Sequence, residues 1–224
     1  MTLEVCCGNL ESVHAAVKGG APRIELCSRL DLDGLSPLWE ELEQARALYP
    51  ALKIHALIRP REGDFCYGPE EAVQMQADIE KALELGADGI VIGALTEKGD
   101  VDRELMAQLV AQVGGRASLT FHRAFDVCAH PFEALSVIES LGFHRILTSG
   151  QAPSALEGTD LLRELQQRAS LTILPGGGVN AANARRILEL TGCTELHASA
   201  STLLPDGRKV SDAKKVAAIL AATE

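Results

Sequence analysis

The sequence predicts a parallel (β/α)₈ barrel in a single domain that covers residues 1–224. Eight short apolar runs alternate with eight amphipathic stretches, which is the pattern of that fold. Three of the apolar runs also end in polar or glycine-rich residues, as expected when the chemistry gathers at the carboxyl ends of parallel strands. These three endings lie within residues 54–61, 120–126 and 171–178.

Runs rich in β-branched residues or leucine predict the strands, and apolar residues at helical spacing predict the helices. Proline in the first turn opens several of the helices, and glycine ends several others as a left-handed C-cap. The expected strands are residues 3–7, 23–27, 52–59, 89–93, 118–122, 145–149, 171–174 and 195–199. The expected helices are residues 10–18, 37–48, 69–85, 101–113, 131–141, 154–169, 181–190 and 211–222.

A doubly wound open sheet is the alternative architecture for this alternation. The edge strands of an open sheet would be less apolar than its central strands. Here the first and last expected strands, 3–7 and 195–199, both carry inward-looking functional residue types, as if they were neighbours. This favours a closed barrel.

Composition limits the possible partners. The 224 residues are 46% hydrophobic, enough for a sizeable core, and no proline- or serine-rich linker divides them. The net charge of −10 has the wrong sign for nucleic acid or an anionic membrane surface. No apolar run approaches the ~20 residues of a membrane span, and no signal-like segment opens the sequence. We therefore expect a cytoplasmic protein with neither kind of partner, whose six cysteines are reduced.

Strand periodicity sorts the polar residues. Residues two apart on a strand share a face, so Glu4 points with Cys6, and Glu25 points with Cys27. A buried carboxylate needs partners, which the arginines and histidines can supply, so we expect these faces to look into the barrel. The alternative is that some look outward toward the helices. The candidate catalytic residues are Glu4, Glu25, Arg59, His122, Arg123 and His197.

Two of these candidates have more than one interpretation. Arg59, at a strand end and fixed by the following proline, suits bidentate contact with a carboxylate or phosphate. It can instead be bound internally to Glu25 or Glu4. His122 can act as a general acid or base, because the ordinary pKa of histidine lies near neutrality, or it can be a hydrogen-bonded strand residue.

A glycine-rich loop follows the seventh expected strand. Consecutive glycines there expose backbone N–H groups, Asn180 can cap the next helix, and barrels commonly hold a phosphate beside their seventh and eighth strands. The alternative is a tight turn that uses glycine for its conformation. A small anionic metabolite is the predicted partner. Its candidate ligands are Ser149, Gly176, Gly177, Gly178 and Ser199.

Two cysteines lie at matching heights on neighbouring expected strands. The sequence has no C-x-x-C pair, so a preformed zinc or iron–sulfur site is not indicated. Cys6 and Cys27 side by side would suit Cu(I), which prefers soft thiolate ligands. The alternative is that they are core residues, which free cysteines commonly are.

Nine segments, in chain order over nearly the whole sequence, resemble the CutC family, which is named for copper homeostasis. The resemblance implies a TIM-type barrel, a cytoplasmic protein, a homodimer, and Cu(I) binding through the cysteines that align with Cys6 and Cys27. The segments are Leu3-Glu4-Val5-Cys6, Arg23-Ile24-Glu25-Leu26-Cys27-Ser28, Ile58-Arg59-Pro60-Arg61, Gly63-Asp64-Phe65, residues 120–126, Ile146-Leu147-Thr148-Ser149-Gly150, Ser154-Ala155-Leu156-Glu157-Gly158, Pro175-Gly176-Gly177-Gly178-Val179 and residues 195–200.

Two classes of function follow. A copper-handling protein would bind Cu(I) through Cys6 and Cys27. An enzyme would hold a small phosphorylated or carboxylated metabolite on the glycine loop and use general acid/base chemistry at the barrel mouth. The second class explains more residues, because a copper carrier has no use for a glycine-rich anion cradle.

Overall fold

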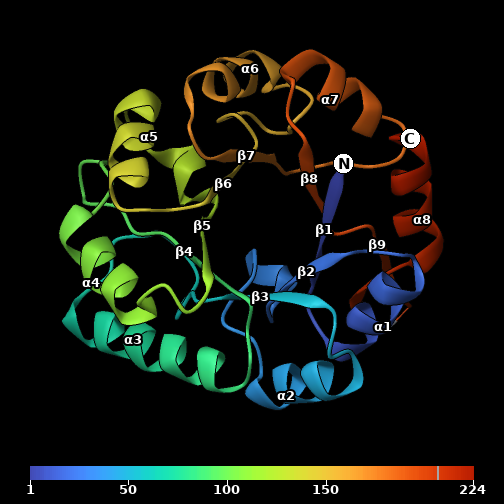
Figure 1. The fold of residues 1–224 in the computed structure, drawn as a ribbon, viewed down its shortest axis with the longest axis horizontal. Coiled ribbons are helices and arrows are strands. Elements are labelled where there is room, and N and C mark those ends of the chain that lie inside the picture. The colour runs from blue at the N-terminus through green and yellow to red at the C-terminus, as the bar shows by residue number, and fades with distance from the viewer. Residues whose placement is uncertain (206) are drawn as a thin grey trace.

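A computed structural model describes residues 1–205 and 207–224 of the chain. Within these ranges, eight parallel strands form a central ring that eight helices surround (Figure 1). The strands β1 to β8 are Thr2–Cys7, Arg23–Leu26, Lys53–Leu57, Gly89–Ile92, Ser118–Phe121, Arg145–Thr148, Thr172–Pro175 and Glu195–Ala198. The helices α1 to α8 are Leu10–Lys18, Trp39–Leu48, Pro69–Glu84, Arg103–Val113, Pro131–Ser140, Thr159–Arg168, Ala184–Thr191 and Ala213–Ala222.

The strand order makes the ring a barrel. Hydrogen-bonded parallel pairs join β8 to β1 and then each strand to the next as far as β7. Strands β7 and β8 lie against each other and complete the ring. The predicted (β/α)₈ fold is confirmed, and the open-sheet alternative is wrong.

Side chains alternate between the two faces of the ring. Outward residues such as Val5 and Ile24 pack under the helices in the main apolar core. The inward residues include a second, smaller apolar cluster made of Cys6, Cys27, Leu57 and Val91. The period-two pattern thus places Glu4 and Glu25, with their cysteine neighbours, inside the barrel, where both carboxylates are buried.

The structure differs from the sequence prediction mainly in the loops. Helix α7 begins at Ala184, and Asn180 accepts from the N–H of Ala182, so the expectation that Asn180 caps this helix is wrong. Two short strands were missed: β9, Ser201–Leu203, and β10, Lys209–Ser211, which form an antiparallel pair. Short 3₁₀ turns, η1 at Leu30–Leu32 and η2 at Arg123–Val127, follow β2 and β5.

The described chain contains no helix that combines the length and the apolar character needed to cross a membrane.

The loop after β6 is held by a close backbone approach. A Cβ on Gly158 would collide with the carbonyl oxygen of Ser149. We therefore expect Gly158→Ala to lower the free energy of unfolding by about 3 kcal/mol in urea titrations. Gly142→Ala is the matched control: Gly142 has φ 84 but nothing near its would-be Cβ, so the cost should be about 1 kcal/mol. Equal losses would contradict the close approach.

Candidate functional site

The carboxylate of Glu4 is the most deeply buried charge in the barrel. Its Oε2 accepts from Nε of Arg23 at 2.6 Å and lies 3.0 Å from Nδ1 of His55, and its Oε1 lies 2.9 Å from Nδ1 of His197. Burial alone would raise the pKa of Glu4, but the hydrogen bond with His197, the nearby His55 ring and the charge of Arg23 hold that pKa well below its usual value. Glu4 is therefore an ionised structural partner that does not line the mouth cavity described below.

Ion pairs extend from Glu4 across the barrel interior. Arg23 Nη2 contacts Oε2 of Glu195 at 2.5 Å, and Nε of Arg145 reaches the same oxygen at 3.1 Å. Arg145 also donates to Oγ of Ser118 at 2.6 Å. Neither Arg23 nor Arg145 is among the site residues predicted from the sequence. The signal was available, because Arg23 lies two residues before Glu25 on the same strand face.

His197 carries a positive charge between this network and the cavity. Burial opposes the imidazolium, but the hydrogen bonds with Cys6 and Glu4 raise the pKa of His197 well above its usual value. The ring lines the cavity and is almost fully buried. His197 is thus a fixed cation beneath the site.

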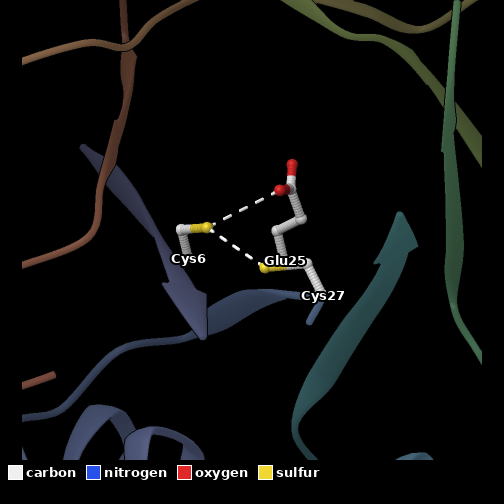
Figure 2. Close-up of side chains that lie close together, drawn as sticks. All are labelled: Cys6, Glu25 and Cys27. Carbon is white, nitrogen blue, oxygen red and sulfur yellow. Dashed lines mark hydrogen bonds between the residues drawn. The ribbon is translucent and has the colours of Figure 1, made fainter. Parts of the chain in front are cut away.

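One carboxyl oxygen of Glu25 accepts a hydrogen bond, and the other has no partner among the described residues. Its Oε1 accepts from Sγ of Cys6 at 3.7 Å, whereas its buried Oε2 has no hydrogen-bond partner among the described residues (Figure 2). Burial raises the pKa of Glu25 to about 7, against the opposing charge of His197. The carboxyl group is therefore poised to gain or lose a proton near neutral pH.

The sulfur atoms of Cys6 and Cys27 lie 3.7 Å apart (Figure 2). Their mutual hydrogen bond and burial raise the pKa of Cys6. The hydrogen bond from Cys6 lowers the pKa of Cys27, but burial and the charge of Glu25 outweigh it and raise that pKa. Both are thiols unless a metal displaces their protons. Donor atoms of Cys6, Glu25 and Cys27 all lie within 4.8 Å of one another, so this cluster fits a soft ion such as Cu(I).

His122 is a neutral hydrogen-bond donor. Its Nδ1 accepts from the N–H of Ala124 at 3.1 Å, so the proton resides on Nε2, which is buried without a partner in the described chain. Burial and the charge of Arg59 lower the pKa of His122 to about 3. The ring is therefore suited to donate a hydrogen bond at neutral pH rather than to take up a proton.

Strand β4 and the residue after it make room for two histidine rings. A Cβ on Gly93 would lie 2.6 Å from Nδ1 of His122, and one on Gly89 would collide with the ring of His55. Phe65 covers His122 from the third loop, with ring centroids 5.0 Å apart. Packing thus fixes the direction of the His122 ring.

Arg59 is bound by backbone, not by acids. Its guanidinium lies 5.0 Å over the ring of Phe65, and its terminal nitrogens donate at 2.9–3.0 Å to three carbonyl oxygens, those of Leu32, Gly34 and Gly63. The alternative that Arg59 pairs with Glu25 or Glu4 is wrong. Because the side chain still lines the mouth, its charge remains available there.

A cavity of about 480 Å³ opens at the carboxyl ends of the strands. Gly177 and Gly178 border it, and within the described chain the amide of neither residue donates to any group. The amide of Gly176 instead bonds to the carbonyl of Thr148 at 2.9 Å. The cavity brings together these predicted residues: Cys6, Glu25, Arg59, His122, Arg123, Gly177, Gly178, His197 and Ser199.

Arg123 is aimed at the glycine loop by two neighbours. Its Nε donates to Oδ2 of Asp126 at 2.7 Å, and its Nη2 lies 3.4 Å from Oγ of Ser149. The hydroxyl of Ser149 donates to the carbonyl of Ala152, so Ser149 orients Arg123 and does not itself line the cavity. Asp126 is not among the site residues predicted from the sequence, although it ends the same polar run three residues after Arg123.

The sequence and the fold are similar to those of one known protein family. The profile of the CutC family matches residues 1–202. The chain belongs to the CutC family. A CutC family protein of Bacteroides fragilis is 47% identical over 206 residues, which cover 91% of this chain and 82% of that protein. One of Vibrio parahaemolyticus is 47% identical over 207 residues, which cover 91% of this chain and 83% of that protein. A Streptococcus agalactiae crystal structure, named as a copper homeostasis protein CutC, is 31% identical with a TM-score of 0.85, covering 89% of this chain and 98% of that one.

The resemblance inferred from the sequence is thus confirmed at the level of the CutC family and its barrel fold. Several lining residues lay outside the sequence prediction, among them Asp126 and Lys209. Lys209, from the β9–β10 hairpin of this CutC family member, lines the mouth. The hairpin strands are only three residues long, so they gave little periodic signal.

The pH dependence of the free energy of unfolding should report the protonation state of Glu25. Its pKa of about 7 in the folded state exceeds the ordinary 4.5, so its contribution to stability is present below pH 4.5 and is lost as the pH rises through 7. Between pH 5 and pH 8, the wild type should therefore lose up to about 3 kcal/mol relative to Glu25→Gln, which cannot ionise. Urea titrations at both pH values measure this difference. The exposed Glu62→Gln is the control, and parallel pH profiles for wild type and Glu25→Gln would contradict the assignment.

Proposed function

We propose that this CutC family member is an enzyme that binds a small phosphorylated or carboxylated metabolite at the barrel mouth and moves a proton with Glu25. The observation that carries the proposal is the free Oε2 of Glu25, a buried acceptor that has no partner in the described chain and belongs to a residue that lines the cavity. An unmet buried acceptor costs about 1–3 kcal/mol, so a ligand that supplies a proton to it would recover that cost.

The protonation of Glu25 supports a role in acid/base chemistry. A group that transfers protons works best when its pKa lies near the operating pH, and burial raises the pKa of Glu25 to about 7. Because Glu25 is 5% exposed, bulk water has little access to it. Perturbed carboxyl groups in a cleft are typical of functional sites.

The charges around the mouth support an anionic ligand. The amides of Gly177 and Gly178 donate to no group in the described chain, and the guanidinium carbon of Arg123 is 3.8 Å from the place of a Cβ on Gly177. Arg59 and His197 add positive charge on other walls of the cavity. A phosphate between the amides and Arg123 would gain charge-assisted hydrogen bonds.

Inorganic phosphate tests the anion site directly. We expect it to bind the wild type and raise its melting temperature, and Arg123→Gln to weaken binding about tenfold or more, because a charge-assisted hydrogen bond contributes roughly 1.5–3 kcal/mol. Isothermal titration measures the affinity. Arg163→Gln, which removes a half-exposed arginine from α6, is the matched control and should bind phosphate like the wild type. Absence of phosphate binding to the wild type would remove the site.

Cu(I) binding in the cytoplasm is the second candidate function, with the copper ion as cargo. It is favoured by the 3.7 Å separation of Cys6 and Cys27 and by the carboxylate of Glu25 beside them. All six cysteines are free thiols, which fits a reducing compartment. Because the metal must displace thiol protons, its affinity should rise with pH.

Paired substitution tests this candidate. We expect the double variant Cys6→Ser/Cys27→Ser to bind Cu(I) at least about 100-fold more weakly than the wild type, because hydroxyl groups are poor ligands for a soft ion. Competition with a chromophoric Cu(I) chelator under reducing conditions gives the affinities. Cys66→Ser, which removes a thiol from the third loop, is the control. Equal affinity in the double variant would exclude the pair.

A further inference from the structure

Two residues that line the same cavity carry buried groups of opposite hydrogen-bonding character. Oε2 of Glu25, from β2, is an acceptor, and Nε2 of His122, immediately after β5, is a donor. Neither has a partner in the described chain, and both residues line the cavity. Buried polar groups normally have partners in the protein or in ordered water, so a ligand in the cavity can supply the partners of this pair.

The donor is fixed in both tautomer and direction. The N–H of Ala124 occupies Nδ1 of His122, and the absence of a side chain at Gly93 lets the ring lie against the backbone there. Since burial and Arg59 lower the pKa of His122 to about 3, the ring stays neutral while it donates. A neutral imidazole donor is suited to an oxygen that gains negative charge during a reaction.

The remaining carboxylate on this side of the mouth is already saturated. Asp126 accepts from Arg123, from the hydroxyl of Thr148 and from the amide of Ser149. Glu25 is thus the buried carboxylate left to take a proton. The walls beside it include the apolar Leu57 and Leu147, which can accommodate a short carbon chain.

We propose that the substrate is a phosphorylated α-hydroxy aldehyde or ketone, and that the site shifts a proton between its two neighbouring carbons, with Glu25 as the base and His122 as the donor to the carbonyl oxygen. This inference rests on the proposed function and names its substrate class. The phosphate would lie on the amides of Gly177 and Gly178 beside Arg123.

The step balances without a co-reactant. Glu25 takes a proton from the carbon that carries the hydroxyl group, and the C–H electron pair becomes the C=C bond of an enediolate. The carbonyl π electrons move to its oxygen, which accepts from Nε2 of His122. Glu25 then returns the proton to the former carbonyl carbon, while the hydroxyl proton passes from one oxygen to the other. An aldehyde and a ketone are thereby interconverted.

Proton exchange with solvent tests the chemistry. In D₂O, the wild type should incorporate deuterium next to the carbonyl of dihydroxyacetone phosphate or ribulose 5-phosphate, as followed by proton NMR. We expect a rate at least about 100-fold lower in Glu25→Gln and at least about tenfold lower in His122→Phe, with His122→Gln, which keeps an N–H donor, in between. Equal rates in the wild type and an identically prepared Glu25→Gln would reveal a contaminating isomerase and overturn the inference.

Binding separates this inference from the proposed function. Phosphoglycolohydroxamate, which mimics a phosphorylated enediolate, should bind the wild type at least tenfold more tightly than glycerol 3-phosphate, and His122→Phe should lose that preference while still binding inorganic phosphate, which also shows that it folds. Phosphate binding with neither exchange nor this preference would overturn the inference and leave the anion site standing. No binding of inorganic phosphate or glycerol 3-phosphate would overturn both.

Discussion

A single buried carboxylate, that of Glu4, sets the charge of the barrel interior. It pairs with Arg23 and holds His197 as a cation. The charge of His197 in turn opposes the effect of burial on Glu25 and keeps the pKa of that carboxyl near 7 rather than higher. Without Glu4, His197 would lose its carboxylate partner and Arg23 would keep only Glu195, and breaking a buried ion pair typically costs several kcal/mol. The reactive part of the site therefore depends on a salt bridge that no ligand touches.

The two candidate functions draw on the same atoms. Cys6 now donates to Glu25, and its sulfur also faces Cys27. A Cu(I) ion on the two sulfurs would replace that donor with a positive charge and lower the proton affinity of Glu25. Copper binding and acid/base chemistry at this carboxyl group would thus be coupled. The metal would change the proton affinity of Glu25 without occupying the anion site at Gly177, Gly178 and Arg123.

Sequence periodicity predicted the parts of the site that lie on strands. Glu25 and Cys27, two apart on one face, and His122 at a strand end converge because parallel strands in a barrel end at the same rim. Periodicity carried no information on partners. Arg59 binds carbonyl groups because the chain after β2 and the third loop fold back over it, and Lys209 reaches the mouth on a hairpin too short to show a pattern. Charge states also depend on burial and neighbours, which only the fold reveals.

Glycine on and beside β4 has a consequence for protein design. Gly89 and Gly93 leave the space that the rings of His55 and His122 occupy. The direction of the His122 donor therefore depends partly on the lack of a side chain at Gly93, beside β4. A designer who transplants Glu25 and His122 into another barrel would have to transplant these two gaps as well. With alanine at the position of Gly93, the grafted imidazole would rotate or withdraw, and a scaffold holding every reactive side chain would still be inert.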